Sequence, residues 1–341
     1  MRQRVSILVL ALAVVAGVLL SGCGGNPRAV ELLARADSLM NGRTDSALTV
    51  LDSLLADADH LSRRQEMRCR LLRMNAINKL DTVFNAVHVS QALALADYFN
   101  RCGTSNEQML AYYLLGRTYI DTGDAPEALR SYQEAINSAD TLSVDCDYST
   151  LCRVYTQMAY VLYYQHLFSD ELVSLNMAKH YGYLAKDTLA ALLAYAQEMD
   201  TYEMMLKPDS MLYICETSSK LLKEIGKTET AAGMLFTPVC FLLDCGNIAK
   251  ARLFLETYEH ESGFFDANNN IETGREIYYY AKGYYYLKTC QYDSAEYFFL
   301  RNLLQEKTLT TRMLDRMVWH CCSSRLISPT QRPSMRSIAM R

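Results

Sequence analysis

The chain has 341 residues, with 34 lysines and arginines against 38 aspartates and glutamates, a net charge of −4 at pH 7. This acidic balance argues against nucleic acid as a partner, because phosphates require a basic face. Half of the residues are hydrophobic, so a core can form, and the length suits one or two compact domains or one long solenoid.

The first residues have the pattern of an export signal. Arg2 and Arg4 precede a largely apolar run, residues 5–20, which is too short for a comfortable membrane span. The run ends in Leu20-Ser21-Gly22-Cys23, which resembles the bacterial lipobox. The resemblance implies that residues 1–22 are a lipoprotein signal peptide. It also implies that Cys23 receives the lipid, that residues 23–28 form a tether, and that the protein is anchored to the outer membrane on its periplasmic face. The alternative is an ordinary signal peptide with an incidental cysteine.

The charge and the cysteines of the exported chain fit this interpretation. Loss of residues 1–22 removes two arginines and no acid, which leaves 32 basic against 38 acidic residues. Apart from Cys23, most of the eleven cysteines lie among apolar helical neighbours without paired spacing. Cysteine behaves there as a small hydrophobe. We therefore expect mostly free thiols, with one adventitious disulfide as the alternative.

Residues 29–308 are predicted to be all-α. Apolar residues recur every three to four positions, and no alternating run is sustained. The most informative stretch is AYYLLGRTYIDTGDAPEALRSYQEA, residues 111–135. Gly116 in its first helix and Ala128 in its second allow close approach of the two helices, and Tyr132 fills the remaining space. Gly123 separates the helices.

This spacing of large and small residues resembles the tetratricopeptide repeat. The same spacing returns 167 residues later, where Tyr279, Gly283 and Phe299 match Tyr112, Gly116 and Tyr132. Weaker copies lie at residues 155–178 and 195–218, with Glu171 and Met211 at positions where the repeat has alanine. Residues 64–99 form another helical pair without the small residues. The resemblance implies about six helical hairpins stacked as a right-handed superhelical solenoid, similar to repeat lipoproteins of Bacteroidetes-like bacteria.

The tyrosines of the repeats fall into two groups. Tyr279 and Tyr286 are predicted to lie in the core. The resemblance places other positions about 100° round the first helix, facing a concave groove. Tyrosine and arginine dominate binding hot spots, so we expect a protein or peptide partner to contact Tyr113, Arg117, Tyr160, Tyr280 and Tyr284. The alternative is that these rings pack against neighbouring repeats or an internal helix.

We find no sequence support for an enzyme, a cofactor or a metal. The chain contains no Gly-rich phosphate loop, no nucleophile elbow and no paired zinc-ligand spacing. The segment FFDANNNIETGRE, residues 264–276, begins like a calcium loop, but Ile271 replaces the required glycine. We interpret it as a polar turn.

The last segment, residues 309–341, differs in composition from the rest. After Thr311 it has six arginines, no lysine, no tyrosine and a single acid, Asp315. It is either a basic tail or an out-of-frame sequence that replaces further repeats. A metal site at His320, Cys321 and Cys322 is disfavoured because adjacent ligands strain to share one ion.

The sequence thus favours a membrane-anchored, non-enzymatic repeat scaffold that binds protein or peptide partners through a tyrosine-rich groove. The alternative function is the sensory or regulatory ectodomain of a signalling protein truncated at its C-terminus. The oligomeric state is not indicated by any pattern in the chain.

Overall fold

The computed structural model describes residues 26–80 and 83–306. Within these ranges it contains fifteen α-helices, one short 3₁₀ helix and a single isolated β-bridge between Phe265 and Ile271. The predicted all-α class and the tetratricopeptide-like helical-hairpin repeats are confirmed. Cys23, the tether up to residue 25 and the segment from residue 309 onward lie outside the described residues.

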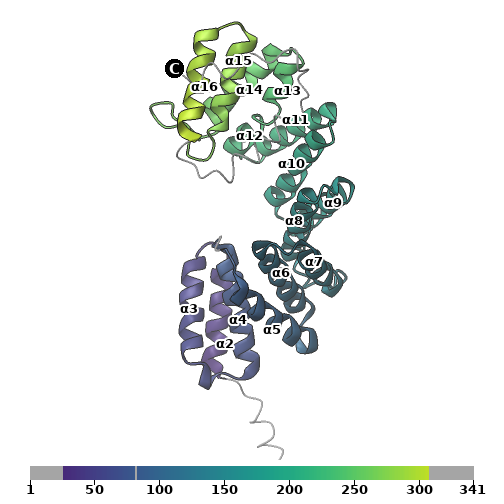
Figure 1. Ribbon diagram of the computed structural model, residues 1–341. Coiled ribbons are helices and arrows are strands. Elements are labelled where there is room, and N and C mark those ends of the chain that lie inside the picture. Colours follow the sequence, from purple (N-terminus) through teal and green to yellow (C-terminus); the bar gives the residue numbers. More distant parts are fainter. Residues whose placement is uncertain (1–25, 81–82, 307–341) are drawn as a thin grey trace, which may run out of the picture. The chain divides into compact units, whose positions relative to one another are not determined.

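The helices divide into two compact units, which meet in sequence between Tyr195 and Ala196. Figure 1 shows their succession along the chain. Unit 1 contains α2 (Pro27–Leu39), α3 (Thr44–Ala56), η1 (Ala58–His60), α4 (Arg63–Lys79), α5 (Ala86–Cys102), α6 (Ser105–Thr122), α7 (Ala125–Ser138), α8 (Tyr148–Tyr164), α9 (Phe168–Leu184) and the start of α10 (Thr188–Met204). Unit 2 contains the rest of α10, α11 (Pro208–Glu224), α12 (Thr228–Met234), α13 (Val239–Asp244), α14 (Ile248–Glu261), α15 (Ile277–Lys288) and α16 (Tyr292–Glu306).

Close approach of paired helices depends on a glycine that faces an aromatic ring. A Cβ on Gly116 of α6 would lie 2.4 Å from the ring of Tyr132 on α7, which is fully buried. A Cβ on Gly283 of α15 would lie 2.8 Å from the ring of Phe299 on α16. The two copies found in the sequence therefore pack in the same way. In each, the aromatic ring of the second helix contacts the backbone of the first helix at its glycine.

The two residues that depart from the repeat pattern are both accommodated in the interior. Glu171 and Met211 are both buried where the repeat has alanine, and α8 and α9 contact each other extensively. A different small residue brings α9 and α10 together, because a Cβ on Gly182 would lie 2.8 Å from the backbone nitrogen of Ala191. The pair α4 and α5, which lacks the small residues, makes few mutual contacts.

Seven of the fifteen described α-helices end in a turn of one kind, with a left-handed residue followed by a backbone hydrogen bond across the turn. After Gly123, for example, the amide of Asp124 donates to the carbonyl of Tyr119 at 2.8 Å. This is the Schellman arrangement. The same bond follows His166, Lys186, Leu206, Gly226, Gly246 and Cys290. Four of these seven residues are not glycine, which is why a search for glycine detects only part of the repeat.

The role of Gly116 leads to a first prediction. Gly116→Ala should lower the free energy of unfolding by about 1–3 kcal/mol, because the added methyl group overlaps the buried ring of Tyr132. Helix propensity alone would act in the opposite direction, by about 1 kcal/mol. Denaturant unfolding measures the change. The loss should shrink in a Tyr132→Leu background, where the ring is absent, and an increase in stability on Gly116→Ala would contradict the packing.

The turns lead to a second prediction, at Leu206. This leucine has φ of 55° and is 72% exposed, so its side chain contributes little packing while the left-handed backbone costs roughly 1–2 kcal/mol. Leu206→Gly should raise the free energy of unfolding by up to about 1 kcal/mol. Glycine removes the backbone strain, but it also adds conformational entropy to the unfolded chain, which offsets part of this gain.

The matched control is Leu253→Gly, at an exposed leucine inside α14. There the same exchange should lower stability by about 1 kcal/mol. Equal effects at the two leucines would show that the turn geometry does not matter.

Candidate functional site

In unit 1, polar side chains from three consecutive first helices are joined by hydrogen bonds. Arg117 on α6 donates from Nε to Oδ1 of Asn78 on α4 at 3.1 Å, and from Nη1 to Oε1 of Gln157 on α8 at 2.9 Å. Asn78, Arg117 and Gln157 are 39 and 40 residues apart in sequence, which is the repeat period. Each repeat thus contributes one rung of a polar ladder.

Asp121 fixes the guanidinium from the same helix. Its Oδ1 accepts from Nη2 of Arg117 at 3.4 Å, one turn away. Its Oδ2 accepts from the backbone amide of Phe84 at 2.9 Å, which ties the start of the α5 segment to α6. The Arg117 side chain is nevertheless 22% exposed, so a side chain held by three polar groups still reaches the surface.

Aromatic side chains continue this surface along α8. Gln157, Tyr160 and Tyr164 are spaced i, i+3 and i+7, so they share one side of the helix. Tyr160 and Tyr164 are each 49% exposed, and their ring centroids lie 4.7 Å apart in an edge-on contact. We call the surface formed by Asn78, Arg117, Gln157, Tyr160 and Tyr164 the ladder face.

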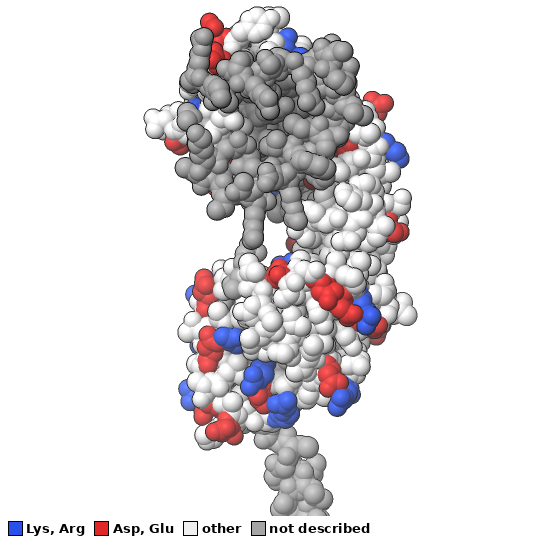
Figure 2. Space-filling model, in the orientation of Figure 1, with Lys and Arg blue, Asp and Glu red and all other residues white. Residues whose placement is uncertain are grey.

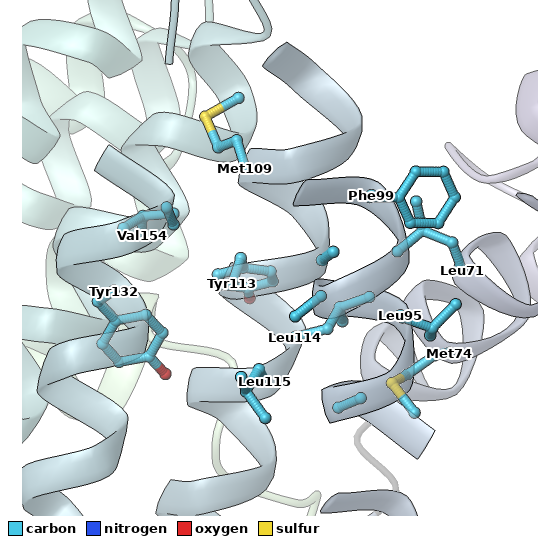
Figure 3. Close-up of a cluster of buried hydrophobic side chains, with 14 of the residues drawn as sticks. Leu71, Met74, Leu95, Phe99, Met109, Tyr113, Leu114, Leu115, Tyr132 and Val154 are labelled. Carbon is cyan, nitrogen blue, oxygen red and sulfur yellow. The ribbon is translucent and has the colours of Figure 1, made fainter. Parts of the chain in front are cut away.

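Tyr113 does not belong to this face, which corrects the prediction made from the repeat positions. It is only 3% exposed and lies among the core side chains of unit 1 (Figure 3). Its ring is 6.3 Å from that of Tyr132 and lies beneath the guanidinium of Arg153 at 5.2 Å. Only its hydroxyl approaches the ladder, as an acceptor from Nδ2 of Asn78 at 3.4 Å. Tyr113 supports the ladder face from below.

In unit 2, Tyr280 and Tyr284 lie one turn apart on α15 and are both half-buried. Their rings stack at 6.2 Å, and the ring of Tyr280 is 5.8 Å from that of Phe299 on α16. The hydroxyl of Tyr284 donates to Oδ1 of Asp244 on α13, and Lys288 lies over the Tyr284 ring at 5.1 Å. These contacts join α13, α15 and α16, as the packing alternative expected, and leave part of each ring at the surface.

Three further tyrosines of α15 pack inside unit 2. Tyr279 is fully buried, as predicted, and Tyr286 is half-buried with its ring stacked 5.4 Å from Phe298. Tyr278 is also buried, which the repeat pattern did not indicate. Its hydroxyl donates to Oε1 of Glu259 at 2.8 Å. Burial and the neighbouring carboxylate raise the pKa of Tyr278 well above its ordinary value.

Other features of the described residues offer little chemistry. Within residues 26–80 and 83–306, no group of three His, Cys, Asp or Glu side chains is arranged to hold a metal ion. In the loop before α15, Oδ1 of Asp266 accepts from the amides of Asn268 and Asn270, both at 2.8 Å. The segment that begins like a calcium loop is therefore a polar turn closed by its own carboxylate.

Seven cysteines of the described part are free thiols: Cys69, Cys102, Cys146, Cys152, Cys215, Cys245 and Cys290. No helix among the described residues combines the length and apolar content that crossing a bilayer requires. Among the described residues visible in Figure 2, acids and bases are interspersed without a large patch of one sign.

No family model matches this sequence, and no curated protein matches it in sequence. Its structure is similar to the apo form of RapI, with a TM-score of 0.67 over 83% of this chain and 77% of that one. It is also similar to BtubC from P. vanneervenii, with a TM-score of 0.53 over 66% and 89% of the two chains. Aspartyl phosphate phosphatase F from Bacillus subtilis gives 0.53 over 81% and 69%. All three are 12% identical to this chain, so the likeness concerns the fold, which is that of tetratricopeptide-like helical repeats.

Proposed function

We propose that the protein is a helical-repeat scaffold without catalytic activity that binds a protein or peptide partner through the ladder face. The observation that carries this proposal is the position of Arg117. Its side chain is hydrogen-bonded to Asn78 of the preceding repeat and to Gln157 of the following repeat, and it is still partly exposed. Amide and guanidinium groups offer the donors and acceptors that a peptide main chain needs. A group fixed before binding loses little conformational freedom when a ligand arrives.

The tyrosines beside the ladder supply the apolar part of the proposed contact. Tyr160 and Tyr164 expose half of their surface, and each ring orders with only two side-chain torsions. Aromatic residues and arginine together form the typical centre of an interface. In unit 2, Tyr280 and Tyr284 remain secondary candidates, because their main contacts are with α13 and α16.

A display library of random dodecapeptides, panned on the purified protein, tests the proposal. Peptides selected in this way should bind Tyr160→Ala at least about tenfold more weakly, since the substitution removes a central aromatic contact. Arg117→Lys should also weaken binding, because lysine keeps the charge but loses the planar fork. Fluorescence polarisation with one labelled selected peptide measures both effects.

The matched control is Tyr183→Ala, because Tyr183 on α9 has the same 49% exposure as Tyr160 but lies on a second helix of unit 1. Its removal should leave peptide affinity unchanged. Thermal unfolding establishes that each variant is folded. If no peptide is selected, or if the selected peptides ignore Tyr160 and Arg117, the ladder face is not a peptide site.

We further propose that the scaffold is attached to the outer membrane, on its periplasmic face, through a lipid on Cys23. The support is the sequence Leu20-Ser21-Gly22-Cys23 after an apolar run. Cys23→Ser in the full-length chain should abolish incorporation of labelled palmitate and move the protein out of the membrane fraction, while Cys102→Ser, at an exposed cysteine of α5, should change neither. Retention of label by Cys23→Ser would place the attachment elsewhere.

A further inference from the structure

The helices α3, α4 and α5 of unit 1 surround a hollow of about 520 Å³. The helices α4 and α5 lack the small residues that let α6 approach α7 closely, and they contact each other less. The hollow lies beside this loosely packed pair. Its size is in the range of small-molecule sites. The lining comes from Asp52, Leu55 and Ala56 on α3, from one side of α4, and from Gln91, Ala94 and Leu95 on α5.

The contribution of α4 alternates cationic and apolar side chains. Arg63, Met67, Arg70, Met74 and Ile77 follow one another at intervals of three or four residues and all line the hollow. That spacing places them on one side of the helix. The methionines form the floor, at 3% exposure each, and methionine adapts its shape to what packs against it.

The charges at the rim do not cancel. Glu66 is the shared partner of two arginines, since its Oε2 accepts from Arg63 at 2.9 Å and its Oε1 from Arg70 at 2.9 Å. Arg73 has its own partner in Asp52, at 2.6 Å. The lining therefore carries three guanidinium groups against two carboxylates, and the surplus positive charge lies beside Arg63 and Arg70. Both of these side chains are about half exposed or more.

We propose that this hollow binds a small anionic amphiphile of the alkyl carboxylate class. The carboxylate would meet the guanidinium groups of Arg63 and Arg70, and the alkyl chain would cover Leu55, Ile77 and Ala94, which line the hollow and are half-buried or exposed. Guanidinium and carboxylate form charge-assisted hydrogen bonds, and the exposed apolar side chains of the lining supply area that an alkyl chain can bury. This site is separate from the ladder face and does not depend on peptide binding there.

Titration calorimetry of the protein with dodecanoate, below the concentration at which it forms micelles, tests the site. The expected result is saturable binding at one site per chain. Arg70→Gln should weaken it at least about tenfold, because a hydrogen bond between charged groups is lost. Ala94→Phe should weaken it similarly by filling the hollow from an exposed position on α5.

Two controls separate this site from non-specific adsorption. Arg101→Gln removes an arginine of α5 that is 74% exposed and paired with Asp97, and it should bind dodecanoate like the parent protein. Dodecyl maltoside has the same alkyl chain without the charge and should bind at least about tenfold more weakly. If Arg70→Gln does not fold, Arg63→Gln replaces it. The proposal fails if binding is not saturable, if the maltoside binds as tightly, or if Ala94→Phe leaves the affinity unchanged.

Discussion

Two repeats have clear sequence signals, and the packing of both depends on one contact. A glycine on the first helix of the pair faces an aromatic ring on the second helix. Gly116 beneath Tyr132, and Gly283 beneath Phe299, let two backbones approach as closely as an aromatic ring allows. Interiors are packed as densely as organic crystals, so the ring and the gap must match in size. Where a different small residue is used, as at Gly182 against Ala191, the approach is backbone to backbone instead.

How far the sequence predicts this structure depends on whether a signal is local. The pairs with glycine, alanine and an aromatic residue at fixed spacing were predicted correctly, because the close contact requires those residue types. The turns after Gln165, Ala185, Met205 and Thr289 gave no such signal, since His166, Lys186, Leu206 and Cys290 take the left-handed conformation that glycine adopts without strain. There the backbone hydrogen bonds, and not the residue type, hold the turn.

The site shows the same limit. Counting around the first helix placed both Tyr113 and Arg117 on the proposed binding face, but only Arg117 is exposed there. The difference arises from α8, whose Arg153 lies over the Tyr113 ring, and a contact between repeats cannot be read from the helix that carries the tyrosine. The bonds of Arg117 to Asn78 and Gln157 were missed for this reason too, although their spacing of 39 and 40 residues matches the repeat period.

The ladder also constrains the shape of a ligand. Packed helices are about 8–10 Å apart, so the axes of α4, α6 and α8 are separated by roughly that distance, while the polar side chains they carry meet at 3.1 and 2.9 Å. An extended chain covers the distance between two axes in about three residues, at about 3.3 Å each, whereas an α-helix rising about 1.5 Å per residue needs about six. Backbone groups of an extended chain are unpaired and can meet a rung at each repeat, while those of a helix are already used within the helix. For the proposed site, an extended segment therefore matches the spacing of the helices better than a helix does.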